Sequence, residues 1–184
     1  MDFNKHLELE GRHAFLGASK YSWLNYDLTK LDMTYKNHQK KMHGTVLHEF
    51  AATAIKLRIP LEKTNQTLNL FVNDAIGFKM TPEQPLYYSQ FCFGTADAIL
   101  FKDKMLRIHD LKTGVSLVSM NQLYIYAALF CLEYNVNPKT IDIELRIYQN
   151  DTALIDVPDK EVISGIMGQI VVFDKHLQKI HYEE

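Results

Sequence analysis

The spacing of the apolar residues changes partway along this chain, and that change restricts the fold more than any other feature. In the first half, apolar side chains recur at helical spacing, as in the stretch 44–59. After Pro85 the pattern becomes short β-rich runs, and residues 141–148 alternate apolar and polar side chains with the two-residue period of a half-buried strand. Both periods in one chain predict an α/β fold.

The expected elements follow from these periods and from the residues that start and stop them. Helices are expected from Ser19, which caps the first one, to about Leu31, and then at 44–59, 63–76, 119–134 and 160–179. Strands are expected at 86–93, 95–101, 105–112 and 141–148, with the polar turn 102–104 closing a β-hairpin. This order predicts a helical N-terminal region and a central mixed β-sheet flanked by helices.

The composition favours one folded domain. The 184 residues are 47% hydrophobic and 23% charged, which is close to the soluble average and excludes intrinsic disorder. Because no linker, repeat or charge block divides the chain, we expect a single domain over 1–184, mainly helical over 1–80, with a sheet core and helices over 85–184.

The net charge and the number of cysteines limit which binding partners and which cellular compartment are expected. The net charge of -2 means that a polyanion must be bound by a local patch, and the basic stretch 30–43, with Lys40 and Lys41, is the candidate. The alternative is that this stretch is simply a charged surface exposed to solvent. The two cysteines lie in apolar runs, which favours a reducing cytoplasm. We expect no membrane partner, because the chain has neither a signal peptide nor an apolar span.

Acidic residues at the ends of two expected strands are the first candidates for chemistry. Side chains two apart share a face of a strand, so Asp110 and Lys112 extend an otherwise apolar face, and Asp97 does so on the neighbouring strand. Two carboxylates beside a core require a cation, which is either Lys112 or a bound metal. Asp97, Asp110 and the Leu111 carbonyl suit Mg²⁺ or Mn²⁺, and Lys112 suits the activation of water. The alternative is that each aspartate faces solvent at a strand end.

Two helices and the N-terminal region add further candidates. His48 and Glu49 lie on the expected helix 44–59, where a packed, non-ligating histidine is the alternative. Gln122 and Tyr126 are four residues apart, so they lie side by side on a helix. Ser19 and Lys20 suit phosphate binding at a helix N-terminus, although a cap alone explains Ser19.

These segments succeed one another in the order of a known superfamily. Residues 44–49 (GTVLHE), 94–97 (GTAD), 110–114 (DLKTG) and 122–126 (QLYIY), with 18–24 near the start, resemble the motifs of PD-(D/E)XK nucleases. Within them the chain is most similar to the RecB-type branch, which includes lambda-type and YqaJ-type phage exonucleases. The resemblance implies a PD-(D/E)XK nuclease-like core.

The resemblance also implies roles for individual residues. His48, Asp97, Asp110 and the Leu111 carbonyl are the implied metal ligands, and Lys112 is the implied catalytic lysine. Gln122 and Tyr126 match the motif that positions DNA, and Glu49 fits a helical acidic position less closely. One or two Mg²⁺ or Mn²⁺ ions are expected. Two cysteines cannot hold the iron-sulfur cluster that many relatives carry, so no cluster is expected.

The function expected from these residues is metal-dependent hydrolysis of DNA, with an exonuclease of phage-type recombination, repair or replication favoured. A structure-specific endonuclease, a metal-dependent phosphatase and a non-cleaving nucleic-acid-binding module are the alternatives. DNA is the expected partner. A ring-shaped homo-oligomer or a recombination or replication partner stays open, and the expected location is the cytoplasm, that of the host if a phage encodes the chain.

Overall fold

The computed structural model describes residues 14–183, without the side chains of Lys20 and Glu183. The chain divides into two compact units, Met1–His43 and Gly44–Glu184, and each is described by itself. Helix α1 (Leu28–Leu57) begins in the first unit and ends in the second. The prediction of one domain stays a prediction.

The described part of the first unit is helical, as expected, but its first element differs from the prediction. A 3-10 helix, η2 (Ala18–Asn25), is preceded by Gly17, so Ser19 lies inside this helix and the prediction that it is the cap was wrong. The Trp23 indole donates a hydrogen bond of 3.0 Å to the Gly17 carbonyl, which ties the ends of this segment together.

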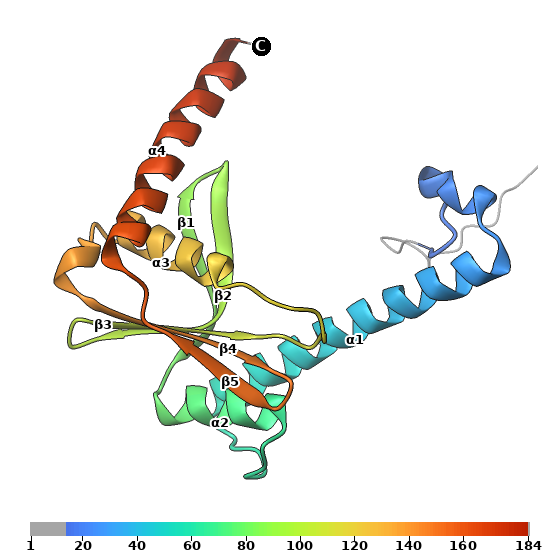
Figure 1. The fold of residues 1–184 in the computed structure, drawn as a ribbon, viewed down its shortest axis with the longest axis horizontal. Coiled ribbons are helices and arrows are strands. Elements are labelled where there is room, and N and C mark those ends of the chain that lie inside the picture. The colour runs from blue at the N-terminus through green and yellow to red at the C-terminus, as the bar shows by residue number, and fades with distance from the viewer. Residues whose placement is uncertain (1–13, 184) are drawn as a thin grey trace, which may run out of the picture. The chain divides into compact units, whose positions relative to one another are not determined.

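The second unit is built around one five-stranded sheet (Figure 1). Its strands lie in sequence order: β1 (Thr81–Ser89), β2 (Cys92–Lys102), β3 (Met105–Leu111), β4 (Asp142–Gln149) and β5 (Thr152–Asp156). All neighbours are antiparallel except β3 and β4, which are parallel and are connected through α3 (Asn121–Glu133). The expected α/β fold with a central mixed sheet flanked by helices is confirmed.

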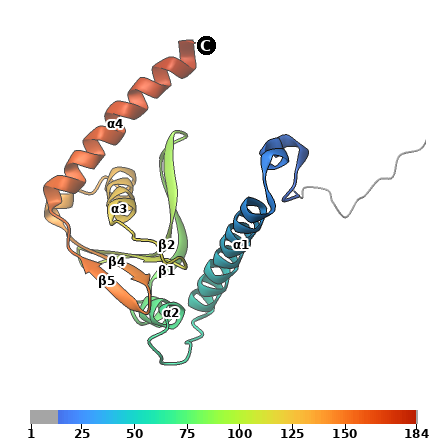
Figure 2. The same cartoon turned by 45° about the vertical axis from the view of Figure 1, so that its right-hand side comes forward.

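Helices cover both faces of the sheet, so β3 lies at the centre of the fold (Figure 2). On one face, α3 and α4 (Lys160–Glu183) pack against Leu106, Ile108 and Leu145. On the other face, the end of α1 and α2 (Thr67–Gly77) pack against Leu111 and Tyr148. Because β3 is covered on both faces, most of its side chains are buried, including the polar His109 and Asp110.

The first strand of the sheet begins earlier in the sequence than predicted, and the sheet has a last strand that was not predicted. The expected strand 86–93 is interrupted by a turn at Gln90, and β1 instead starts at Thr81 and contains Pro82 and Pro85. Because β1 is an edge strand, prolines are tolerated there. The short edge strand β5 was not predicted. It follows a tight turn in which Asn150 and Asp151 have φ angles of 50° and 58°.

Both cysteines are free thiols, and Cys131 is buried among apolar side chains. Burial raises the pKa of the Cys131 thiol to about 11. Within residues 14–183, no helix combines the length and the apolar character needed to cross a membrane.

A polar network is buried on the α2 side of the sheet. The Tyr148 hydroxyl donates to Asp74 at 2.7 Å and lies 3.3 Å from His109 Nδ1, while Arg146 pairs with Asp74 at 3.2 Å. The other imidazole nitrogen of His109 has no hydrogen-bond partner among the described residues. Burial, and then the charges of Arg146 and Arg107, lower the pKa of His109 to about 3.

This histidine predicts a loss of stability in acid. Between pH 7 and pH 5 the unfolded chain protonates His109, whose ordinary pKa is 6.5, whereas the folded protein keeps it neutral. Through this residue, acid therefore favours unfolding by about 2 kcal/mol over that range. Urea denaturation at the two pH values should show the parent losing about 2 kcal/mol more than His109→Gln. Equal losses in the two proteins would contradict the assignment.

Candidate functional site

Three carboxylates are aligned across three neighbouring strands. The pairs Pro82 with Ala98 and Gln84 with Ala96 place Glu83 opposite Asp97. The pair Ala98 with His109 places Asp97 opposite Asp110 in the same way. We call Glu83, Asp97 and Asp110 the acidic row. Like charges directly opposite one another destabilise a sheet, so this row requires compensating positive charge or hydrogen-bond donors.

A hydrogen bond from a backbone amide to a side chain fixes the middle carboxylate of the row. The Leu111 amide donates to Asp97 Oδ2 at 2.7 Å, which attaches the carboxylate of β2 to the end of β3. The same oxygen lies 3.4 Å from His48 Nδ1. Asp97 is thereby oriented by the backbone on one side and by an imidazole of α1 on the other.

Asp110 is the most deeply buried member of the row. Its side chain is only 2% exposed, and Lys112 Nζ lies 2.9 Å from Oδ2 and donates to Oδ1 at 3.2 Å. Oδ2 itself accepts no hydrogen bond from the described residues. Burial and the Asp97 charge raise the pKa of Asp110 to about 6, although Lys112 acts in the opposite direction. This oxygen thus has the Lys112 charge beside it but no donor aligned for a hydrogen bond.

A chain of hydrogen bonds leads from Asp110 to α3. Lys112 Nζ donates to Gln122 Oε1 at 2.7 Å, and Gln122 Nε2 donates to the Tyr126 hydroxyl at 2.9 Å. The glutamine therefore orients the lysine and the tyrosine together. Gly94 permits this arrangement, because a Cβ atom there would lie 2.8 Å from the Tyr126 ring.

At the other end of the row, His48 approaches from α1. A Cβ atom at Gly44 would lie 2.8 Å from Thr113 Oγ1, so the glycine lets α1 pass close to the segment after β3. His48 is one helical turn later and on the same face of the helix. A hydrogen bond with Asp97, together with the charges of Asp110 and Glu83, raises the pKa of His48 even though burial lowers it.

Among the described residues, His48, Glu83 and Asp97 are best placed to hold a metal, and we call these three residues the metal group. Each offers one ligand atom, and these atoms all lie within 4.8 Å of one another. An imidazole with two carboxylates suits Mn²⁺, and Mg²⁺ accepts the same oxygens. Glu83 is exposed, yet desolvation of its carboxyl, and then the Asp97 charge, raise its pKa.

The structure adds one candidate, Glu83, to the predicted ligand set. Glu83 was not predicted, because it lies between two prolines in a stretch that sequence patterns treat as a connection. Asp110 is paired with Lys112 and is not part of the metal group, and its role as a metal ligand stays a prediction. The Leu111 carbonyl as a ligand stays a prediction.

The remaining predicted site residues are Glu49, Ser19, Lys20, Lys40 and Lys41. Glu49 is exposed on α1 and is not part of the metal group. Ser19, Lys40 and Lys41 are exposed residues of the first unit, and their contact with DNA stays a prediction. The side chain of Lys20 lies outside the described part of the chain.

The metal group predicts different effects for two glutamates. Glu83→Gln removes a charged member of the group and should weaken Mn²⁺ binding by at least about tenfold. Glu49→Gln, at a glutamate that is also exposed but lies outside the group, should leave it unchanged. Titration calorimetry of both variants and the parent measures this directly. Equal affinities for the parent and Glu83→Gln would exclude Glu83 as a ligand.

Comparison with known proteins assigns no activity to this arrangement. Residues 79–157 match a family described as a protein of unknown function (DUF2800). The matched stretch includes all five strands and the acidic row, but not His48. No curated protein and no solved structure matches the chain at a significant level.

Proposed function

We propose that the protein is a metal-dependent nuclease that hydrolyses DNA phosphodiester bonds. The observation that carries the proposal is the acidic row, with His48 at one end and the hydrogen-bonded Lys112, Gln122 and Tyr126 at the other. This arrangement joins a set of metal ligands to a lysine that is already oriented. The resemblance to PD-(D/E)XK nucleases implies the same combination.

The fold supports the proposal in two ways. The site lies where β2 and β3 carry their acidic residues, and α3, which connects β3 to the parallel strand β4, supplies Gln122 and Tyr126. This agrees with the nuclease-like core that the resemblance implies. A single continuous stretch, 94–126, therefore supplies most of the site.

The donor set fits a hard divalent cation. His48, Glu83 and Asp97 would hold it, and Asp110 Oδ2 is a further oxygen that the described residues leave without a hydrogen bond. When bound, Mg²⁺ or Mn²⁺ supplies a polarised water and positive charge for the phosphate.

The protein's own groups then have distinct roles. Lys112, oriented by Asp110 and Gln122, places a positive charge beside the row, where it orients the attacking water and stabilises the charge that develops on the phosphate. The Gln122 amide fixes the lysine, and the Tyr126 hydroxyl offers a further polar contact to the DNA backbone. Of the activities that such a site supports, we propose exonucleolytic cleavage.

This proposal predicts a selective effect of one lysine. Lys112→Ala should lower the rate of DNA cleavage by about 10²- to 10⁴-fold. Lys102→Ala provides the matched control, because Lys102 is an exposed lysine at the turn end of β2, where it pairs with Asp103. Both variants are assayed with the parent on end-labelled linear DNA and closed circular DNA, single- and double-stranded, with Mn²⁺, Mg²⁺ or EDTA.

Metal-dependent degradation of linear DNA alone is the expected result. Cleavage of the closed circular DNA would show that the protein is an endonuclease and not an exonuclease. DNA binding without cleavage under every condition, by a protein that still binds Mn²⁺, would reject the nuclease and favour a non-cleaving binding module.

A further inference from the structure

A hollow lined by aromatic rings lies within the first unit. It has a volume of about 410 Å³, and its rings belong to Phe15, Trp23, Tyr26 and His38. We call it the aromatic hollow. The Phe15 and His38 ring centroids are 5.3 Å apart, and the hydrogen bond from the Trp23 indole to a backbone carbonyl fixes that ring in place. The hollow has the size of a small-molecule site and offers flat π faces to its occupant.

One face of α1 forms a wall of the aromatic hollow and carries a lysine at each end. The residues of α1 that line the hollow are Thr34, Asn37, His38 and Lys41. Their spacing of three and four residues places them on the same side of the helix. Lys30 lies one turn earlier on this side, and its Nζ is 4.8 Å from the centroid of the Tyr26 ring. Lys30 and Lys41 are three turns, or about 16 Å, apart along the helix axis.

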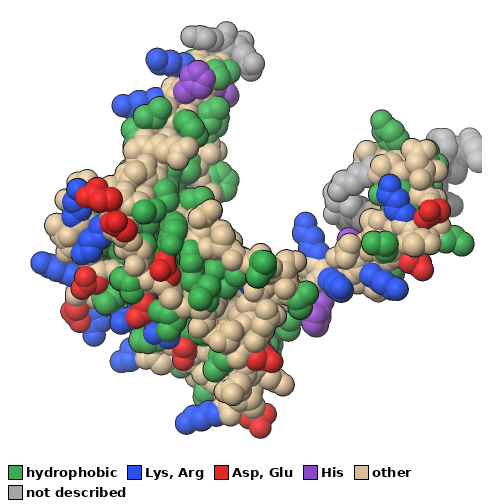
Figure 3. All heavy atoms as spheres, viewed as in Figure 1, with side chains coloured by type: hydrophobic (Ala, Val, Ile, Leu, Met, Phe, Trp, Pro, Cys, Tyr) green, Lys and Arg blue, Asp and Glu red, His purple; other side chains and the backbone are tan. Residues whose placement is uncertain are grey.

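The charge around the aromatic hollow is positive, although that of the whole chain is -2. Between residues 14 and 43 the sequence has five lysines and two aspartates. One of these acids, Asp27, accepts a hydrogen bond of 2.7 Å from the Lys30 amide at the start of α1. Figure 3 shows basic side chains gathered along α1. An occupant with an aromatic group and negative charges is therefore complementary to this surface.

The lining also has polar groups that can recognise the edge of a ring. The Asn37 amide makes no hydrogen bond with the described residues, so both its donor and its acceptor are available to an occupant. The Ser22 and Tyr26 hydroxyls, 3.5 Å apart, belong to the same lining. Aromatic faces with an amide beside them are suited to an unstacked nucleobase, which stacks on the rings and forms hydrogen bonds along its edge.

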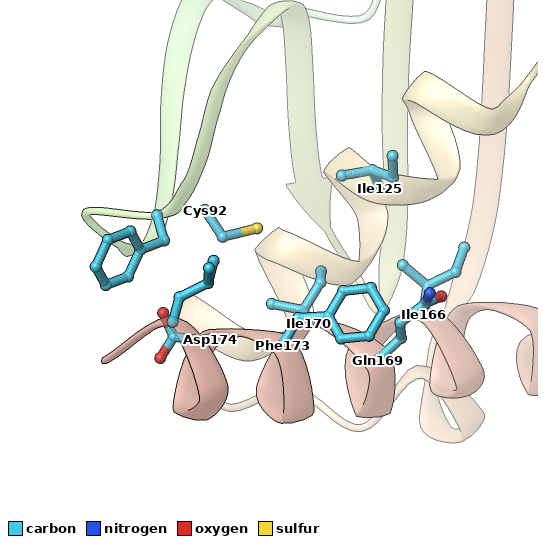
Figure 4. A pocket seen from close by; sticks show the side chains of 9 residues that line it. Cys92, Ile125, Ile166, Gln169, Ile170, Phe173 and Asp174 are labelled. Atoms are coloured by element: carbon cyan, nitrogen blue, oxygen red, sulfur yellow. The ribbon is translucent and has the colours of Figure 1, made fainter. Parts of the chain in front are cut away.

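A second hollow, in the second unit, has a different chemistry. It is lined by Phe91 and Cys92 at the tip of the β1–β2 hairpin, by Ile125 of α3, and by α4 (Figure 4). Apart from Gln169 and Asp174, every side chain that lines it is apolar or a thiol, and none of these described residues is a cation. Of the two hollows, the aromatic hollow is therefore the one that suits a nucleotide.

We propose that the aromatic hollow binds one unpaired base of single-stranded DNA, with Lys30 and Lys41 contacting the phosphates on either side. Stacking of bases on aromatic side chains, with lysines along the backbone, is the way proteins hold single strands. A paired base is excluded, because its faces are stacked within the duplex and its edge is bound to the opposite strand. The choice of DNA rests on the proposed function, for which the hollow specifies a substrate with unpaired nucleotides.

Binding in the aromatic hollow can be measured apart from cleavage. Trp23 is the single tryptophan of the chain and lines the hollow, so its fluorescence reports directly on the occupant. The full chain is titrated with a single-stranded oligothymidylate in EDTA, where metal-dependent cleavage does not occur. We expect quenching of the Trp23 emission that saturates and that weakens as salt is raised. Quenching without cleavage in Mn²⁺ would reject the nuclease and keep this inference, whereas cleavage without quenching would do the reverse.

Two histidines of α1 provide a matched pair of variants. His38 lines the aromatic hollow, whereas His43 is exposed on the same helix and does not line it. His38→Ala should raise the dissociation constant for the oligothymidylate by at least about fivefold, because one stacking partner is lost, and His43→Ala should leave it unchanged. Asn37→Ala, which keeps every ring, should weaken binding as well. Circular dichroism establishes that all three variants keep the parent's helix content.

The same oligothymidylate annealed to its complement should bind more weakly than the single strand. Equal or tighter binding of the duplex would overturn the assignment to an unpaired base, and tighter binding of an oligouridylate would overturn DNA as the ligand. Equal effects of the two histidine variants would overturn the aromatic hollow as the binding site. Unchanged Trp23 emission at the highest oligothymidylate concentration would overturn it too.

Discussion

The burial of β3 on both faces is the constraint on which the rest of the structure depends. A central strand covered by two helical layers leaves little solvent for a charged side chain near its end, yet β3 carries Asp110 next to its last residue, Leu111. Its carboxylate is therefore compensated within the protein, by Lys112 two residues later. The register of β1, β2 and β3 then aligns Glu83 and Asp97 with Asp110, which produces the acidic row.

The helices around this row are held close to it by the absence of side chains at two positions. Gly44 lets α1 pass beside Thr113, and Gly94 lets the Tyr126 ring lie against β2. Any larger residue would need its neighbour to move. His48 on α1 and the hydrogen-bonding residues on α3 are therefore positioned by the close approach of backbones, which composition and periodicity do not reveal.

Sequence patterns predicted the parts of the site that depend on local periods. Asp110 and Lys112 share a face through the two-residue period of a strand, and Gln122 and Tyr126 lie together through the four-residue spacing of a helix. Glu83 depends on the register between two strands, which local patterns do not specify. Glu49 directly follows His48, and consecutive helical residues point in directions about 100° apart, so both could not face the row. The edge strand β5 was not predicted because its five residues are mostly exposed.

Burial is the largest cause of the raised pKa values of Asp110 and Glu83, and Asp97 is a cause that all three shifted groups of the site share. Asp97 contributes to the raised pKa of His48, of Glu83 and of Asp110, so each of these groups holds a proton more firmly than it would alone. Protons bound in this way neutralise the row as a cation would. A divalent ion between the same carboxylates would displace them, because metal ligands bind in their deprotonated forms. The arrangement that makes the row costly to fold is therefore also the one that favours a cation, and Lys112 supplies only one positive charge against three carboxylates.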